Sequence, residues 1–153
     1  MVPLLLVRHG RAGNRSKWKR DDRLRPLSRR GLRQAKDLVP LLEPYKPKRI
    51  LASPYVRCAQ TVEPLASKLG SKVEEVEELA EGKGPEAVSL LASLLDLSYA
   101  VVVCTHGDVM LEALSTLGKD VPQGPPAAKG AVWVLERKKR GGAVVARYLP
   151  PPT

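Results

Sequence analysis

The stretch Leu4-Leu5-Leu6-Val7-Arg8-His9-Gly10 decides the fold, because it joins a short apolar run to a histidine and a glycine. The same arrangement returns in Ala100-Val101-Val102-Val103-Cys104-Thr105-His106-Gly107, and His9 and His106 are the only histidines of the chain. Each apolar run is typical of a buried strand. In open α/β sheets, ligands bind in the crevice beyond the carboxyl ends of the strands. The two imidazoles are therefore predicted to form half of an active site at one edge of a sheet.

Amphipathic segments between the two histidine strands predict helices. Ser28 is expected to cap the first helix, and Pro40 to kink it or end it early. Its predicted buried face holds apolar residues at helical spacing: Leu32, Ala35, Val39 and Leu42. A strand over residues 49–52 leads to Ser53-Pro54, which reads as a serine N-cap followed by proline at the first helical position. The second helix is expected to start there and to end at Gly70.

The second half of the chain continues the alternation. A weak strand is expected near residues 73–76, a helix from about Pro85, and another helix after His106. The sequence thus predicts an α/β fold of three layers, α/β/α, with a mostly parallel central sheet. Residues 131–135 and 143–148 predict an antiparallel hairpin at one edge. We expect one domain over residues 1–149 and a disordered tail over residues 150–153.

The composition restricts the class of protein. Apolar residues make up 43% of the 153, whereas aromatic residues make up 4%, so platforms for stacking bases are scarce and nucleic acid is an unlikely partner. The apolar start is too short for a signal sequence, and no stretch reaches membrane-spanning length. We therefore expect a cytoplasmic protein with no membrane partner. Cys58 and Cys104 lack the spacing of a metal site and are expected to be reduced, structural thiols.

The net charge of +10 is unevenly distributed. Residues 8–33 hold eleven Lys and Arg but only two acids, whereas residues 74–86 hold six Glu and one Lys. Because the basic block begins beside His9, it is predicted to steer an anionic substrate toward that residue. The alternative is an ordinary solvated surface.

Two arginines accompany the histidines in a pattern that suits phosphate. Arg8 precedes His9, and Arg57 lies in the first turn of the second predicted helix. Guanidinium groups match the geometry of phosphate, and the free N–H groups at a helix start also favour an anion. Phosphoryl transfer needs fixed cations around a nucleophile. His9 is predicted to be that nucleophile and to form a phosphohistidine, the alternative being two histidines that merely cap strand ends.

Five segments in register resemble the histidine phosphatase superfamily, which has the phosphoglycerate mutase-like fold. They are Arg8-His9-Gly10, 27–35, 53–61, 79–82 and Thr105-His106-Gly107. The short length is similar to the compact SixA-like branch, and residues 12–18 and 21–27 resemble the phosphatase-like domain fused to some MutT-type Nudix hydrolases. The resemblance implies an enzyme that needs no metal or other cofactor. In it, His9 carries the phosphoryl group and His106 donates to the phosphoryl oxygens.

The resemblance also implies roles for residues outside the two strand ends. Glu81 matches the acid that protonates the leaving group, although Glu78 is close enough in sequence to be an alternative, and Glu81 could be one more solvated acid. Asn14 and Gly107 are implied as further phosphate ligands. Two arginines of the loop after the first strand are implied to contact the substrate: Arg11 and Arg15.

These observations predict a phosphatase whose partner is a phosphorylated substrate. A phosphohistidine protein is the first expectation, because the chain is short and has little insertion that could form a lid. A small phosphomonoester or nucleotide is the alternative substrate. A non-catalytic module that binds phosphate or nucleic acid is the alternative from another class of protein.

Overall fold

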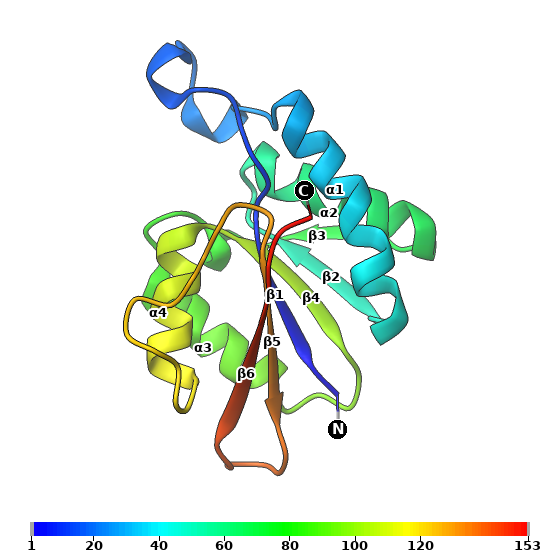
Figure 1. Ribbon diagram of the computed structural model, residues 1–153, viewed down its shortest axis with the longest axis vertical. Helices are drawn as coiled ribbons and strands as arrows, with labels where there is room; N and C mark the ends of the chain where they lie inside the picture. The colour runs from blue at the N-terminus through cyan, green and yellow to red at the C-terminus, as the bar shows by residue number, and fades with distance from the viewer. Residues whose placement is uncertain (1, 153) are drawn as a thin grey trace.

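The structure is a computed structural model that describes residues 2–152. A six-stranded sheet has the order β3-β2-β4-β1-β5-β6 (Figure 1). The parallel strands are β1 (Leu4–Arg8), β2 (Arg49–Ala52), β3 (Val73–Glu75) and β4 (Val101–Thr105). β5 (Val132–Arg137) pairs antiparallel with β1, and with β6 (Val144–Leu149) it forms the edge hairpin. The predicted mostly parallel sheet with an antiparallel hairpin is confirmed.

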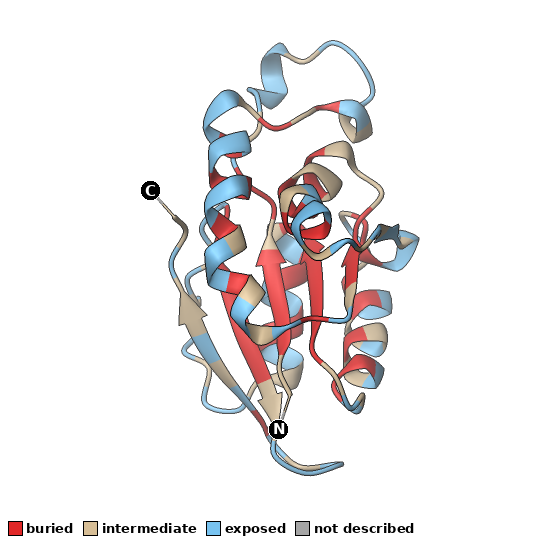
Figure 2. Ribbon diagram, turned by 90° about the vertical axis from the view of Figure 1, so that its right-hand side faces the viewer, coloured by how far each residue is buried: buried red, intermediate tan, exposed pale blue. Residues whose placement is uncertain are grey.

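Helices cover both faces of this sheet. The helices α1 (Arg29–Leu42) and α2 (Val56–Leu69) pack together on one face, and α3 (Gly84–Leu94) and α4 (Gly107–Leu117) on the other. Successive side chains of β1 point to opposite faces of the sheet. Leu5 packs in the apolar cluster that contains Leu38, and Leu6 packs in the cluster that contains Leu91. Figure 2 shows the central strands buried between helices whose outer surfaces are exposed. This double coverage explains the uninterrupted apolar runs before His9 and His106.

Two expectations for α1 are wrong, although Ser28 is its N-cap and accepts a hydrogen bond from the Gly31 N–H at 3.2 Å. The helix does not end early at Pro40 but continues to Leu42, whereas the alternative of a kink at Pro40 stays a prediction. Pro40 lies on the exposed side, where water can solvate the backbone carbonyl that proline leaves unpaired. Leu32 is 44% exposed, because the buried stripe runs one position earlier, through Gly31, and continues through Ala35, Leu38 and Leu42.

The expected start of α2 is also wrong. The helix begins at Val56 with Tyr55 as its N-cap, and Ser53 does not cap it. The Ser53 oxygen accepts the Tyr55 N–H at 3.2 Å in a local turn that precedes the helix, and the same hydroxyl lies 2.8 Å from Nε2 of His106. Gly70 ends the helix with φ 67°, a left-handed conformation that favours glycine, as predicted.

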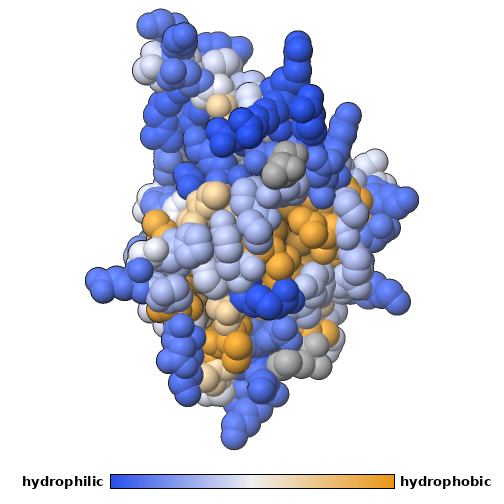
Figure 3. Space-filling model, viewed as in Figure 1, coloured by the Kyte–Doolittle hydropathy of each residue, from blue (hydrophilic) through white to orange (hydrophobic). Residues whose placement is uncertain are grey.

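The segment between β1 and α1 forms a projecting arm, which we define as residues 11–27 (Figure 1). The short 3-10 turns η1 (Arg15–Lys17) and η2 (Asp22–Leu24) shape it, and a bridge between Ala12 and Leu27 closes its base. The surface of the arm is hydrophilic (Figure 3). Two further 3-10 turns, η3 (Glu43–Tyr45) and η4 (Glu77–Leu79), follow α1 and β3.

The two ends of the chain lie beyond the regular elements. Residues 150–152 have no regular secondary structure, and Pro151 and Pro152 are half-buried. Met1 and Thr153 lie outside the described residues, so the predicted disorder of residues 150–153 stays a prediction. Within residues 2–152, no helix combines the length and the apolar character needed to cross a membrane.

Candidate active site

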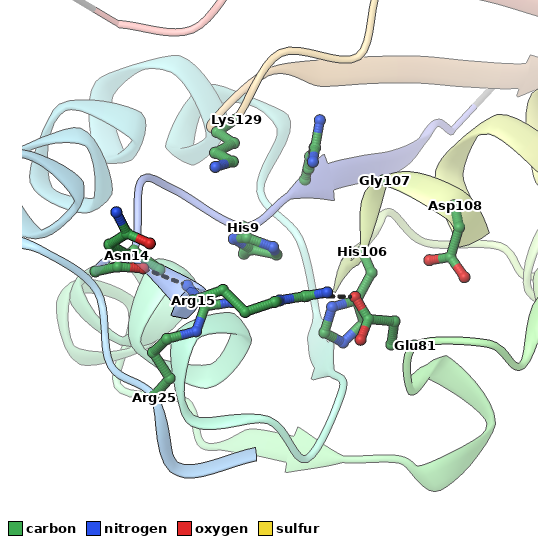
Figure 4. Close-up of a pocket in the computed structure, with 12 residues that line it drawn as sticks. His9, Asn14, Arg15, Arg25, Glu81, His106, Gly107, Asp108 and Lys129 are labelled. Atoms are coloured by element: carbon green, nitrogen blue, oxygen red, sulfur yellow. Dashed lines mark hydrogen bonds and ion pairs between the residues drawn. The ribbon is translucent and has the colours of Figure 1, made fainter. Parts of the chain in front are cut away.

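A cavity of about 790 Å³ lies at the carboxyl ends of β1 and β4 (Figure 4). β1 and β4 are parallel neighbours with Arg8 opposite Thr105, so the residues that follow the two strands meet. The rings of His9 and His106 have centroids 5.5 Å apart and are inclined at 68°. Twelve residues line the cavity: Arg8, His9, Ala12, Gly13, Asn14, Arg15, Arg25, Glu81, His106, Gly107, Asp108 and Lys129.

His9 is buried, and one of its two ring nitrogens is already bonded. Nδ1 lies 2.8 Å from the carbonyl oxygen of Gly10. Because a carbonyl can only accept, Nδ1 carries the ring hydrogen and Nε2 keeps a lone pair. The surroundings lower the pKa of His9 to about 3, first because burial removes water and then because Arg57, His106 and Arg8 repel a proton; the Gly10 carbonyl acts in the opposite direction. His9 is thus a neutral imidazole at neutral pH, as a nucleophile must be.

The backbone of Gly10 is itself fixed by a hydrogen bond to α2. Its N–H donates to the Thr61 hydroxyl oxygen at 3.0 Å, and that hydroxyl donates to the backbone carbonyl of Arg57 at 2.7 Å. Thr61 therefore joins the first turns of α2 to the backbone that orients His9.

His106 is almost fully buried, with one nitrogen bonded and the other free. Its Nε2 lies 2.8 Å from Oγ of Ser53, and that oxygen accepts the Tyr55 N–H at 3.2 Å. Sγ of Cys58 lies 3.6 Å from the same nitrogen. Because a hydroxyl and a thiol can each donate to a lone pair, we assign Nε2 as the acceptor, which places the ring hydrogen of a neutral imidazole on Nδ1. Nδ1 is buried and has no hydrogen-bond partner among the described residues. It is a donor that lacks an acceptor, beside His9.

Arg8 and Gly107 share the space between β1 and α4. Nη1 of Arg8 donates to the carbonyl of Ala127 at 2.6 Å, whereas its Nε is buried without a partner among the described residues. A Cβ on Gly107 would lie 2.7 Å from Cζ of Arg8. Gly107 therefore leaves the room that the guanidinium occupies, and its own N–H belongs to the unpaired first turn of α4.

Arg57 is fully buried and does not line the cavity. Its Nη1 donates to the Asp22 carbonyl at 2.9 Å and its Nη2 to the Asp22 carboxylate at 3.0 Å. The same carboxylate accepts from Nε of Arg25 at 2.9 Å. Burial alone would raise the pKa of Asp22, but the hydrogen bonds and charges of Arg25 and Arg57 outweigh it and lower that pKa. Asp22, from the arm, is thus the anchor of both arginines.

Glu81 lies at the cavity, whereas Glu78 is exposed and does not line it. Oε1 of Glu81 accepts from Nη2 of Arg15 at 2.8 Å and is 3.9 Å from Nη2 of Arg57. Figure 4 shows Arg15 reaching across the cavity mouth to this carboxylate. Of the two acids that the sequence left open, only Glu81 has access to a ligand in the cavity.

Asn14 and Arg11 differ in their relation to the cavity. Asn14 lines it, but Oδ1 of Asn14 accepts from the N–H and hydroxyl of Ser16 at 2.9 and 2.7 Å, so its amide NH₂ is the group left for a ligand. The Arg11 side chain is exposed and does not line the cavity, whereas the Arg11 N–H donates to Gln34. The expected contact of Arg11 with substrate thus has no support in this geometry.

Sequence reasoning did not single out five cavity residues, of which three are charged: Arg25, Asp108 and Lys129. Asp108 follows His106 by two positions, so the strand-end argument could have included it. Lys129 precedes β5, and only the pairing of β5 with β1 brings it to His9. Within residues 2–152, no group of three or more His, Cys, Asp or Glu side chains could hold a metal ion. Cys58 and Cys104 are free and buried.

Residues 4–88 match the model of the histidine phosphatase superfamily, branch 1. This chain belongs to that superfamily. An 8-oxo-(d)GTP phosphatase of Mycolicibacterium smegmatis is 37% identical over 156 residues, which cover 97% of this chain. They cover only 48% of the relative, so the chain spans about half the length of that protein.

Solved structures share the fold at lower identity. The protein histidine phosphatase SixA in complex with tungstate superposes with a TM-score of 0.79 at 22% identity, covering 99% of this chain and 97% of SixA. YhfR of Bacillus stearothermophilus superposes with a TM-score of 0.78 at 19% identity, covering 94% of each chain. At these identities the likeness to SixA and YhfR shows a shared fold.

Proposed function

We propose that His9 is the nucleophile of this phosphatase and that the substrate is a small phosphomonoester or nucleotide. The hydrogen bond from Nδ1 of His9 to the Gly10 carbonyl carries this proposal. It leaves the Nε2 lone pair free on a neutral ring that lines a cationic cavity. Donors for the phosphoryl oxygens come from Arg8, from the unpaired Nδ1–H of His106, from the Asn14 amide and from the Gly107 N–H.

The groups that stabilise the negative charge of the phosphoryl group lie at different distances from the cavity surface. The Asn14 amide and the first-turn N–H of Gly107 lie at the cavity wall, within the part that a phosphoryl group would enter. Arg57 lies deeper, held by Asp22, and acts as a fixed positive charge behind His9. Because these donors are held in place before the reaction, no reorganisation is needed when charge spreads over the phosphoryl oxygens.

The reaction consists of two displacements at phosphorus. Nε2 of His9 forms a bond to phosphorus, and the ester P–O bond breaks with its electron pair on the leaving oxygen. That oxygen takes a proton that the Glu81 carboxylate has first acquired from solvent. Glu81 then accepts a proton from water as the water oxygen bonds to phosphorus, and the P–N pair returns to Nε2. Nδ1 keeps its hydrogen on the Gly10 carbonyl throughout.

Glu81 supports a small ester over a phosphohistidine protein as substrate. An alkoxide leaving group needs a proton, whereas the imidazole of phosphohistidine leaves with far less help. Glu81 lies at the cavity mouth, where it is hydrogen-bonded to Arg15, and from there it can supply that proton. The 37% identical relative is named for a nucleotide substrate, whereas the likeness to SixA concerns the fold.

Trapping of the intermediate tests the nucleophile. Wild-type protein mixed with ³²P-labelled substrate in EDTA and quenched without acid should carry an acid-labile, base-stable label on His9, because a protonated P–N bond breaks readily. His9→Asn should remain unlabelled and lose at least about a thousandfold in turnover. Label on another residue, or a substantially active His9→Asn protein, would remove His9 from this role.

The leaving-group requirement tests the substrate class. Glu81→Gln should slow hydrolysis of a nucleoside monophosphate by about a hundredfold, and that of p-nitrophenyl phosphate much less, because nitrophenolate needs little protonation. Glu78→Gln makes the same change of charge three positions away, outside the cavity, and should leave both rates unchanged. A wild-type enzyme that ignores nucleoside monophosphates but dephosphorylates a phosphohistidine protein would favour the SixA-like substrate instead.

A further inference from the structure

The loop before β5 is fixed beside His9 by hydrogen bonds at the peptide group that joins Lys129 to Gly130. The Gly130 N–H donates to the carbonyls of Arg8 and His9 at 3.1 and 3.0 Å. The Lys129 carbonyl accepts from Nε2 of Gln34 at 3.1 Å. Gly130 has φ +86°, and a Cβ there would lie 3.0 Å from Gln34, so the close approach depends on glycine. The backbone that presents Lys129 is thus built into the site.

Lys129 itself is an unneutralised charge at the cavity rim. Arg15 is paired with Glu81, and Arg25 with Asp22, but among the described residues no carboxylate forms an ion pair with Lys129 or Arg8. Partial burial, and then the charges of Arg8, Arg25, Arg11 and Arg15, lower the pKa of Lys129. Asp108 also borders the cavity and acts on Arg8, but neither Lys129 nor Arg8 forms an ion pair among the described residues. An anion bound between them would relieve the repulsion of their like charges.

The position of Lys129 separates it from the transferred phosphoryl group. In Figure 4, Lys129 and Glu81 lie on opposite sides of His9, and both border the same cavity. Arg8, His106, Asn14 and Gly107 already offer donors to one phosphoryl group on His9, so Lys129 is not needed for that group. The volume of about 790 Å³ leaves room for a larger anion that reaches the rim.

We propose that Lys129 binds a second phosphate of the substrate, adjacent to the one that His9 takes, so that the enzyme accepts phosphoanhydrides such as nucleoside diphosphates. The proposal rests on the phosphatase cavity described above and narrows its substrate class. Nε2 of His9 bonds to the terminal phosphorus, and the P–O–P bond breaks with its pair on the bridging oxygen. That oxygen stays on the leaving nucleotide as a stable phosphate oxygen and needs no proton. Water then cleaves the P–N bond, which yields inorganic phosphate and releases one proton to solvent.

Binding of two inorganic anions tests this assignment without turnover. Isothermal titration calorimetry at constant ionic strength would compare inorganic pyrophosphate with inorganic phosphate. We expect pyrophosphate to bind about tenfold more tightly to wild-type protein, because one additional charge-assisted hydrogen bond supplies about that factor. Lys129→Gln should abolish this preference and leave the affinity for phosphate within about twofold of wild type.

Lys139→Gln is the matched control. It removes the same charge from the turn between β5 and β6, at the far end of the hairpin from His9, and should preserve the preference for pyrophosphate. Equal affinities of wild-type protein for the two anions, or equal losses in the two variants, would overturn the proposal. These outcomes are independent of whether His9 becomes phosphorylated, so failure of the subsite and failure of the proposed phosphatase mechanism are distinguishable.

Discussion

The protonation of His9 should couple the stability of the fold to pH, and His9→Asn should remove that coupling. Folding lowers the pKa of His9 to about 3 from the 6.5 of an unperturbed histidine. Below pH 6.5 the unfolded chain therefore takes up a proton at this position that the folded protein does not. The free energy of unfolding falls as the pH falls, and the loss grows until the pH approaches the folded pKa.

The size of this effect at pH 5 depends almost entirely on the unfolded state. With an unfolded pKa of 6.5, proton uptake at His9 lowers the free energy of unfolding by about 2 kcal/mol between pH 8 and pH 5. The value is nearly the same for any folded pKa below about 4, because the folded ring is then neutral at both pH values.

Urea unfolding at pH 8 and pH 5 would measure the coupling. Wild-type protein should lose about 2 kcal/mol more than His9→Asn over this interval, since the other titrating groups are common to both proteins. His9→Asn changes the absolute stability as well, so the comparison concerns the pH dependence of each protein and not their stabilities at one pH. Parallel curves for the two proteins would mean that His9 titrates normally in the fold, and the argument for a permanently neutral nucleophile would fail.

Two further substitutions test the supports of the site. Gly107→Ala should displace the Arg8 guanidinium, whose Cζ would lie 2.7 Å from the new Cβ, and should lower kcat/KM about tenfold with little change in Tm. An unchanged kcat/KM would show that the guanidinium position does not matter to the reaction. Ser53→Ala should cost about 1–2 kcal/mol of stability by leaving Nε2 of His106 without its hydroxyl donor. Unchanged ¹⁵N chemical shifts of the His106 ring in Ser53→Ala would refute the tautomer assigned to it.

Much of the fold follows from short-range patterns in the chain. Apolar runs before His9 and His106 predict buried strands, and the residues after parallel strands lie at one edge of a sheet. Ser28 caps the start of α1 with its hydroxyl, and Gly70 ends α2 in a left-handed backbone conformation, as the sequence predicts. At Ser53 the hydroxyl makes a local turn with the Tyr55 N–H and has a second partner in His106, 53 positions away in sequence. A local cap signal cannot anticipate a competing partner from another strand.

By itself, the sequence determined that two strands present His9 and His106 beside arginines, because hydrophobic periodicity and turn residues act over a few positions. Only the tertiary structure decided which charges meet at the cavity. The arm carries Asp22 to Arg57, and the pairing of β5 with β1 carries Lys129 to His9. Backbone hydrogen bonds between strands are the same for any apolar sequence, so the order of strands depends on how the whole core packs and not on a motif that can be read along the chain.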